Sequence, residues 1–225
     1  MKLQQVELRY GTRKILSQLT TEIHPGEFIF LIGPSGSGKT SFIRTLVGEL
    51  APISGEVIDN EGRNLYQLKP RELAQYRRKI GVVFQDFKLL DNKSVKDNVI
   101  FAMEVSGYPD SIIQKRLPEV LTEVGLLSKK EALVETLSGG EAQRIGIARA
   151  LIHNPDIIIG DEPTGNLDPE NAKEIMMIFE RLHKEGKTIV ISTHDSLLVD
   201  GMRKRVIEFG KNTIVRDENP GNYTK

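Results

Sequence analysis

Hydrophobic and polar residues alternate through much of the first 65 residues, as in KLQQVELRY at residues 2–10. Alternation of this kind predicts strands with one buried face. Residues 28–32, FIFLI, are all apolar, which is typical of a strand covered on both faces. Segments 79–84, 156–160 and 187–192 also predict strands. The chain therefore begins with a strand-rich region and returns to strands in its C-terminal third.

Apolar residues three and four positions apart predict helices over residues 39–49 and 70–78. From about residue 92 to 136 the helical periodicity continues with no strand candidate, which indicates an inserted helical subdomain. We expect Pro118 to kink or split a helix there, because proline interrupts helical hydrogen bonds. The alternation of strands and helices elsewhere predicts an α/β fold with a parallel sheet and helices on both faces.

Composition narrows the class of protein only slightly. A length of 225 residues suits one domain, or one core with an inserted subdomain. Lys and Arg together number 31, as do Asp and Glu, so no excess positive charge indicates a nucleic-acid surface. The chain has no cysteine, which excludes disulfides and thiolate chemistry.

The apolar runs are far shorter than the roughly 20 residues that a membrane helix needs, and the N-terminus has no apolar signal segment. We therefore expect a cytoplasmic protein without direct membrane insertion, for which any membrane role requires a partner. The polar residues 217–225 are expected to form a flexible tail.

The stretch GPSGSGKT, residues 33–40, lies between a predicted buried strand and a predicted helix. It matches the pattern G-x-x-x-x-G-K-[ST] through Gly33, Gly38, Lys39 and Thr40. In such a loop, backbone N–H groups surround phosphate oxygens, and side chains in place of glycine would block that approach. Lys39 is expected to reach the outer phosphates and Thr40 to offer its hydroxyl to Mg²⁺. A plain glycine-rich turn is the alternative, and the strand and helix on either side favour phosphate binding.

A second nucleotide motif is IIIGDEP, residues 157–163, where an apolar strand ends in two carboxylates. Alone, two acids after a strand are more often a solvated strand end. Together with the phosphate loop, they predict that Asp161 holds the Mg²⁺ shell and that Glu162 polarises a water against the terminal phosphate.

A third motif is LSGGEAQR, residues 137–144. Ser138 and Glu141 form the sequence pattern of a capping box, which alone explains those two residues. It does not explain Gly139 and Gly140 in the first helical turn, where each costs up to about 1 kcal/mol relative to alanine. We interpret the glycines as a place where something approaches the backbone closely, and the helix N-terminus as a second anion site.

Together these motifs resemble the ATP-binding cassette (ABC) ATPase family, in the family's order and over nearly the whole chain. GPSGSGKT resembles the Walker A loop, GDE the Walker B motif, LSGGE the signature motif and GNLD the D-loop. Single residues such as Tyr10, Gln85 and His194 have ordinary structural explanations when taken alone, and only their spacing within the motif set favours functional roles. The signature has Glu141 where Gln is commoner, and no catalytic group is missing.

The resemblance implies a role for each matching residue. The expected catalytic residues are Glu162 as base, Gln85, the switch histidine His194 and Lys39. The expected metal ligands are Thr40, Gln85 and Asp161, for Mg²⁺. The expected ATP-binding residues are Tyr10, which would stack on adenine, with Gly33, Pro34, Ser35, Gly36, Ser37, Gly38, Lys39, Thr40, Ser41, Ser138, Gly139, Gly140, Glu141 and Asp168.

The resemblance also implies an architecture: a P-loop NTPase of ABC type, α/β, with a mainly parallel core sheet, an N-terminal antiparallel β-subdomain and an inserted helical subdomain. The expected boundaries are about 1–91 and 155–216 for the ATP-binding core and about 92–154 for the helical subdomain. Two such chains are expected to pair head to tail in an ATP-dependent homodimer.

The stretches PTGNLD, 163–168, and FQDFKLLDNKSVKDNV, 84–99, are similar to one subgroup of the family. It contains cell-division, lipoprotein-release and macrolide-efflux ATPases, and the cell-division type is the most similar. That type implies a polytopic membrane partner and a place on the inner face of the membrane. Phe87, Leu89 and Leu90 are a candidate docking cluster for the partner, with internal packing as the equal alternative.

Two other classes of protein stay open at this point. An ATP-gated binding module is disfavoured by the intact Glu162 and His194. A soluble ABC protein that acts on nucleic acid is disfavoured because the chain has one cassette and no heptad tract.

Overall fold

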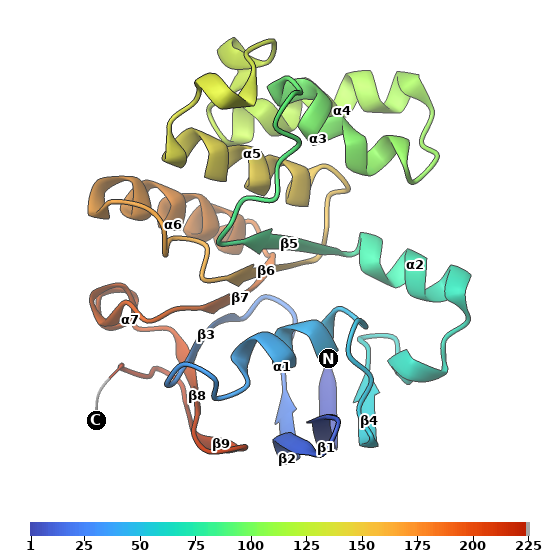
Figure 1. The fold of residues 1–225 in the computed structure, drawn as a ribbon, viewed down its shortest axis with the longest axis vertical. Helices are drawn as coiled ribbons and strands as arrows, with labels where there is room; N and C mark the ends of the chain where they lie inside the picture. Colours follow the sequence, from blue (N-terminus) through green and yellow to red (C-terminus); the bar gives the residue numbers. More distant parts are fainter. Residues whose placement is uncertain (224–225) are drawn as a thin grey trace. The chain divides into compact units, whose positions relative to one another are not determined.

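The structure, a computed structural model, describes residues 1–223. It contains two compact units, each described by itself: Met1–Arg78 together with the segment from Thr188 onward, and Lys79–Lys187 (Figure 1). The first unit holds the predicted phosphate loop and the second holds the predicted helical subdomain. Part of the predicted tail, residues 224–225, lies outside the described residues.

The N-terminal strands of the first unit form an antiparallel sheet. Its order is β2-β1-β4, and the strands are β1 (Lys2–Tyr10), β2 (Arg13–Glu22) and β4 (Ser54–Ile58). In the central strand Leu3 lies opposite Thr21 on one side and Val57 on the other. Leu3, Val6 and Leu8 are fully buried. Val6 and Leu8 share a face because alternate residues of a strand point to the same side, and a register shift at the left-handed Gln5 accounts for the three-residue spacing from Leu3 to Val6. The expected antiparallel β-subdomain is confirmed.

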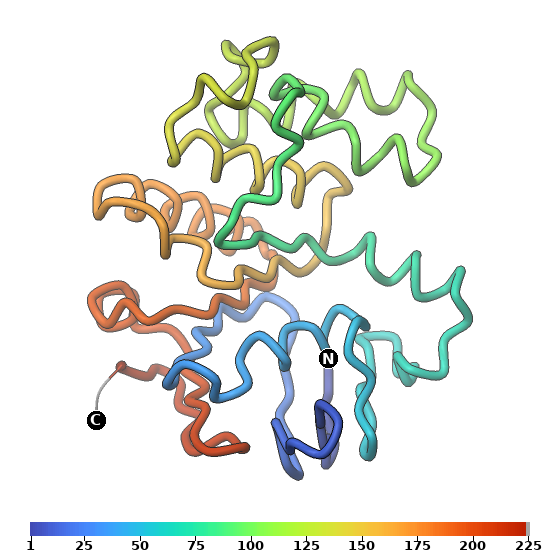
Figure 2. Tube along the Cα trace, in the orientation of Figure 1, coloured from blue at the N-terminus to red at the C-terminus, as the bar shows by residue number. Residues whose placement is uncertain are grey.

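The same unit contains a second sheet built around the apolar run at 28–32. This run is β3 (Phe28–Ile32), and it lies between β7 (Thr188–Ser192) and β8 (Arg205–Phe209), parallel to both (Figure 2). All five residues of β3 are buried, as expected for a strand covered on both faces. The last strand, β9 (Ile214–Glu218), runs antiparallel to β8 and extends two residues into the predicted tail.

Helices complete the first unit. The helix after the phosphate loop buries Phe42, Ile43 and Leu46 on one face. The helical elements are α1 (Lys39–Leu46), the 3-10 turn η1 (Leu65–Gln67), α2 (Pro70–Arg78) and α7 (Ser196–Met202). The helix predicted over 70–78 therefore forms with those bounds, and the one predicted over 39–49 ends three residues early.

The second unit contains two parallel strands, β5 (Ile80–Phe84) and β6 (Ile157–Asp161), with Val83 opposite Gly160. Between and after them lie helices α3 (Val95–Glu104), α4 (Asp110–Glu123), α5 (Gly139–Leu151) and α6 (Pro169–Lys184), and the 3-10 turns η2 (Leu127–Lys129) and η3 (Val134–Thr136). No regular strand lies in the segment 92–136, as predicted. The parallel pairs of the two units and the antiparallel β8–β9 pair agree with a mainly parallel core.

The prediction that Pro118 splits a helix is wrong. Helix α4 runs without interruption from Asp110 to Glu123 with Pro118 inside it. The missing N–H would have bonded the carbonyl of Gln114, and both residues are on the exposed side of the helix. Water can therefore bond that carbonyl, and the buried face of α4, which contains Leu117 and Leu121, holds the helix in place.

Arg205 bonds several partners within the first unit. Its guanidinium donates at 2.8 Å to Glu27, to Asp217 and to the backbone carbonyl of Glu22. Its side chain is only 12% exposed. Hydrogen bonds to Asp217, and then the charges of Asp217 and Glu27, raise the pKa of Arg205.

We predict that Arg205→Ala lowers the free energy of unfolding by about 2–3 kcal/mol, because it leaves two partly buried carboxylates without their partner. The control is Lys2→Ala, since the Lys2–Glu22 pair is half exposed on both sides. That change should cost less than about 1 kcal/mol. Urea denaturation of both variants measures the difference, and equal losses would contradict the assignment.

Candidate functional site

The phosphate loop connects β3 to α1 within the first unit. Gly33 has φ 131°, and a Cβ atom at this position would lie 2.2 Å from the carbonyl oxygen of Phe209 on β8. Only glycine fits such a close approach. Gly38 stands at the N-cap of α1, and no side chain caps the helix. The first amides of α1 are therefore available to an anion, as the sequence motif predicted.

Lys39 is buried, with 6% of its surface exposed. Its Nζ donates to the carbonyl oxygens of Gly33 at 2.7 Å and Pro34 at 3.3 Å. His194, 155 residues later in the chain, places Nε2 3.3 Å from the same Nζ. An ammonium group can only donate, so this contact requires an unprotonated Nε2. The structure thus brings together the predicted phosphate lysine and the predicted switch histidine.

Other predicted ATP-binding residues surround this loop. Tyr10, at the end of β1, is 46% exposed, and its hydroxyl accepts a hydrogen bond from Arg44 at 3.3 Å. Its ring is therefore open to a stacking partner. Thr40 is exposed, whereas Ser41 is buried. Ser37 is also buried, and its Oγ has no hydrogen-bond partner.

A cavity of about 340 Å³ lies against the outer part of the phosphate loop. Residues of three segments line it: the phosphate loop, the start of β2 and the β8–β9 turn. They are Arg13, Lys14, Ile15, Pro34, Ser35, Gly36, Ser37, Gly210, Lys211 and Asn212. Its walls carry three cations and no carboxylate, which suits an anionic ligand. The sequence analysis missed Arg13 and Lys211, because no motif marks them.

The paired carboxylates follow β6 in the second unit. Asp161 is the last residue of the strand and is half-buried. Glu162 has φ 50°, a left-handed conformation that costs a residue with a side chain about 1–2 kcal/mol. Its carbonyl accepts the amide of Gly165 at 3.1 Å. Strain of this kind is typical of functional sites.

Gln85 lies beside the GNLD segment in the same unit. Its side-chain Nε2 donates to Oδ1 of Asn166 at 3.0 Å, and Nδ2 of Asn166 donates back to the Gln85 carbonyl at 3.1 Å. Gly165 lies between Gln85 and Glu162, since a Cβ there would be 2.9 Å from Gln85 Nε2 and 3.4 Å from the Glu162 carbonyl oxygen. Asn166 was not among the predicted site residues, although it lies inside the GNLD stretch.

The signature segment forms the expected capping box. The hydroxyl of Ser138 accepts the amide of Glu141 at 3.3 Å, and the Glu141 carboxylate accepts the amide of Ser138 at 3.1 Å. Glu141 also pairs with Lys129. The hydrogen bond from Lys129, and then that from the Ser138 amide, lowers the pKa of Glu141.

The two signature glycines have different surroundings. At Gly140 a Cβ would lie 2.2 Å from Oδ1 of Asn171, whereas at Gly139 the nearest atom would be a Leu167 methyl at 3.7 Å. The close neighbour that requires glycine at 140 therefore comes from within the chain. Asn171 also donates to Asp168, the N-cap of α6, from its amide at 3.0 Å and its side chain at 2.6 Å. These two bonds lower the pKa of Asp168, the backbone bond first.

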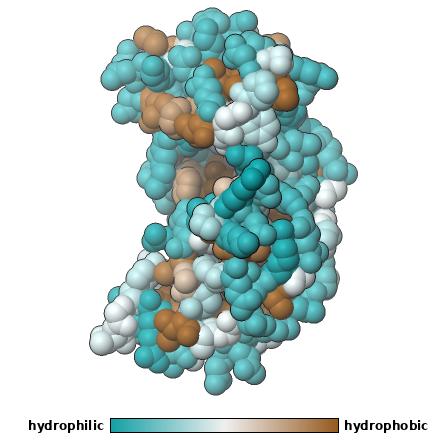
Figure 3. All heavy atoms as spheres, turned by 90° about the vertical axis from the view of Figure 1, so that its right-hand side faces the viewer, coloured by the Kyte–Doolittle hydropathy of each residue, from teal (hydrophilic) through white to brown (hydrophobic). Residues whose placement is uncertain are grey.

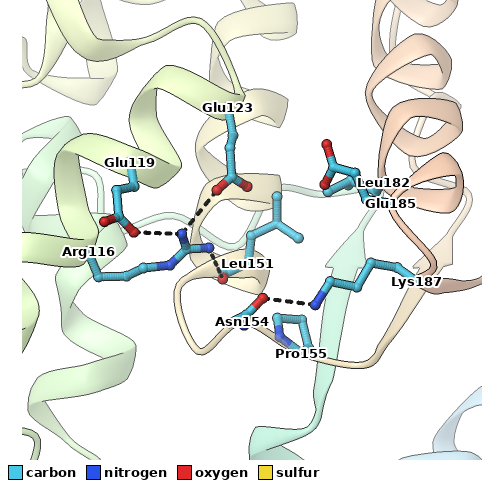
Figure 4. A pocket seen from close by; sticks show the side chains of 9 residues that line it. All are labelled: Arg116, Glu119, Glu123, Leu151, Asn154, Pro155, Leu182, Glu185 and Lys187. Atoms are coloured by element: carbon cyan, nitrogen blue, oxygen red, sulfur yellow. Dashed lines mark hydrogen bonds and ion pairs between the residues drawn. The ribbon is translucent and has the colours of Figure 1, made fainter.

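A second cavity, of about 200 Å³, lies away from the motifs in the second unit (Figure 4). Arg116 on α4 donates to Glu119 at 3.1 Å, to Glu123 at 3.0 Å and to the Leu151 carbonyl at 3.2 Å. Arg116 thus joins α4 to the end of α5 at the wall of this cavity. Its bonds serve the packing of the helices, and the cavity does not belong to the nucleotide site.

The candidate metal ligands are all oxygen donors: the Thr40 hydroxyl, the Gln85 amide oxygen and the Asp161 carboxylate. Hard oxygen donors of low charge suit Mg²⁺, which also takes water and phosphate oxygens. Among residues 1–223 no group of three or more His, Cys, Asp or Glu side chains forms a metal site of its own. Thr40 of the first unit, and Gln85 and Asp161 of the second, therefore each carry a donor whose chemistry suits Mg²⁺ bound with a phosphate ligand.

Comparison with known proteins identifies the family. The ABC transporter family model matches residues 16–165. The chain belongs to this family and is an ABC-type ATPase with the fold predicted from its motifs. The chain is similar to a solved structure of the ATP-binding cassette MJ0796, described as a dimeric post-hydrolysis state bound to ADP and Pi. The TM-score is 0.85 and the sequence identity 32%, and the match covers 98% of this chain and 99% of the MJ0796 chain.

Within the family the chain is similar to proteins named cell division ATP-binding protein FtsE. The Bacillus subtilis protein is 47% identical over 93% of this chain and 92% of its own length. The Mycobacterium tuberculosis protein is 46% identical over 96% of this chain and 94% of its own. The subgroup expected from residues 84–99 and 163–168 is therefore confirmed. In the described part of the chain, no helix has the length and apolar character to cross a membrane.

We predict different effects of alanine on stability at the two signature glycines. Gly140→Ala should lower the free energy of unfolding by about 1–3 kcal/mol, because its methyl group would displace the bonded Asn171 side chain. Gly139→Ala, the control, should be neutral or stabilising by up to about 1 kcal/mol, because it has space and alanine favours the helix. Urea denaturation measures both. Adding Asn171→Ala to Gly140→Ala should recover part of the loss, and additive losses would refute the clash.

Proposed function

We propose that the chain is the ATP-binding and hydrolysing subunit of an FtsE-like membrane complex. In this complex it pairs with an FtsX-like polytopic partner, and ATP hydrolysis is coupled to cell division and to control of cell-wall hydrolases. The protein would lie in the cytoplasm, held on the inner face of the membrane by the partner. The observation that supports the nucleotide chemistry is the buried Lys39 ammonium, 3.3 Å from His194 beside the uncapped start of α1.

The binding step follows from the charges of the phosphate loop. ATP brings about four negative charges, which Lys39, the α1 amides and Mg²⁺ offset before two chains can close over it. Lys39 now bonds the carbonyls of Gly33 and Pro34, so a phosphate oxygen would replace neutral acceptors with a charged one. Thr40, Gln85 and Asp161 would hold the Mg²⁺, which supplies further positive charge to the phosphates.

The hydrolytic step requires a second copy of the chain. In a head-to-tail homodimer, Ser138 and Gly140 of one copy would bind the γ-phosphate held by the other, and the solved MJ0796 cassette is also dimeric. Glu162 would orient the attacking water, with Gln85 beside it and His194 at the γ-phosphate. Loss of the γ-phosphate removes the shared ligand and the dimer reopens, which the membrane partner would sense.

We predict that Glu162→Gln lowers turnover about 10²–10⁴-fold and leaves ATP binding intact, because the amide cannot act as a base. Phosphate release and binding of a fluorescent ATP analogue measure the two effects. If the variant hydrolysed ATP at the normal rate, the assignment of Glu162 as the base would be wrong.

The same variant identifies the partner. A tagged Glu162→Gln protein is purified with ATP from detergent-solubilised native membranes, and the associated proteins are sequenced. A polytopic protein with a large extracytoplasmic loop and cell-wall-enzyme companions supports the division complex. A lipoprotein-release or efflux permease supports a transport role instead, and no membrane protein would count against both.

The docking surface is proposed to lie around Leu90 and helix α3. Leu90 is 36% exposed, and Phe101 and Val105 on α3 are 44% and 67% exposed. In the upper half of Figure 3, small apolar patches lie among hydrophilic residues over the helical part of the second unit. Asn98 on α3 bonds both the amide and the carbonyl of Leu90, at 2.7 and 3.1 Å. Phe87 and Leu89, also predicted to dock, are only half exposed.

We predict that Leu90→Asp abolishes recovery of the protein with partner-containing membranes, because it places a charge on the apolar surface. ATP binding should be unchanged, since Asn98 holds the backbone of Leu90 and not its side chain. The control is Val215→Asp on β9, at a residue that is 57% exposed in the other unit. If the Leu90 variant still sediments with membranes, the docking surface is elsewhere.

A further inference from the structure

The segment directly after Gln85 contains a strained turn. The amide of Lys88 donates to the carbonyl of Asp86 at 2.5 Å, which closes a turn of three residues with Phe87 at its centre. Phe87 and the following Lys88 have φ values of 54° and 48°. Left-handed three-residue turns are rare and strained, and two consecutive left-handed residues with side chains are rarer still. The turn therefore depends on contacts that hold it in this form.

Arg149, near the end of helix α5, supplies those contacts. Its Nη1 donates to the carbonyl of Lys88 at 2.6 Å and its Nη2 to the carbonyl of Phe87 at 2.8 Å. The planar guanidinium can bond two neighbouring carbonyls at once, which an ammonium group cannot match. Burial lowers the pKa of Arg149, although a guanidinium remains charged at neutral pH.

The same face of α5 contacts the chain on both sides of Gln85. Gln143 donates to the carbonyl of Phe84 at 3.3 Å. At Gly146 a Cβ would lie 3.8 Å from the carbonyl oxygen of Phe87. Residues 143, 146 and 149 are three positions apart and share one side of the helix. This side of α5 therefore contacts the segment from Phe84, at the end of β5, to Lys88 in the turn.

The same helix begins at the signature motif, with Ser138 as its N-cap and Gly140 in its first turn. We propose that Arg149 is a positioning residue for ATP hydrolysis: by bonding the Phe87 and Lys88 carbonyls of the turn, it fixes Gln85 relative to α5 and so to the signature motif. It does not touch nucleotide. The proposal rests on the proposed role of Gln85 in hydrolysis.

The test compares Arg149→Ala, Arg149→Lys and a control, Arg116→Ala, in the full chain. Arg116 also donates to a carbonyl of α5, that of Leu151, but has no bond to the turn. For Arg149→Ala we expect a fall in kcat of at least 10-fold, with the Kd of ATP changed less than 2-fold. Arg149→Lys, which keeps the charge but not the fork, should be intermediate. Methylguanidinium should partly restore the turnover of Arg149→Ala.

Arg116→Ala should lower the melting temperature as much as Arg149→Ala and leave kcat within 2-fold. An equal fall of kcat in both variants, or a parallel loss of ATP affinity in Arg149→Ala, would show that Arg149 only supports the fold. If Arg149→Ala does not fold, the kcat of Arg149→Lys decides, and a normal value overturns the proposal. Gln85→Ala separates the two hypotheses. If Gln85→Ala loses turnover while the Arg149 variants keep it, only the Arg149 proposal is overturned. If Gln85→Ala keeps normal turnover, the proposed role of Gln85 is overturned, and with it the Arg149 proposal that rests on it.

Discussion

The buried ammonium group of Lys39 at the start of α1 is the constraint on which the nucleotide site depends. It is 6% exposed and lies beside helix amides that no side chain caps. An ammonium and a helix N-terminus both carry positive charge, so the arrangement favours an anion in the same place. In the structure, the Lys39 ammonium donates to the neutral carbonyl oxygens of Gly33 and Pro34. The close approach of Gly33 to Phe209, and the β3–β8 pairing that produces it, maintain this geometry.

Three left-handed residues with side chains lie in segments where chemistry is expected, and the buried core strands β3 and β7 are regular. These are Glu162 after β6 and Phe87 and Lys88 after Gln85, whereas others, such as Gln5 in β1 and Gln18 in β2, lie away from the motifs. In contrast, all residues of β3 and β7 are buried in extended conformation. The buried strands fix the ends of the loops, and those fixed ends allow the loops to adopt conformations that a free peptide would avoid.

The sequence predicted the parts of the site that depend on neighbours in the chain. The phosphate loop and the Ser138–Glu141 capping box are local patterns, and both form as expected. It did not reveal contacts between distant residues. Asn171 explains Gly140, and Asn166 holds Gln85, but each pair is separated by 31 or more positions in the numbering. Pro118 was misjudged because propensity ignores which side of a helix faces water, and the lost hydrogen bond lies on the exposed side.

Helix α5 contacts three segments of the second unit that carry predicted site residues: the signature motif, the Gln85 turn and the segment after Glu162. Its 13 residues correspond to about 20 Å of rigid rod. One end carries Ser138 and Gly140, with Gly140 in contact with the residue that bonds Asp168. The other end carries Arg149, which holds the turn after Gln85. Between them the buried Gln143 bonds both Phe84 and the Pro163 carbonyl, one residue after Glu162. Because a packed helix moves as a unit, a displacement at the Gln85 turn must reach the signature motif unless one of these bonds breaks.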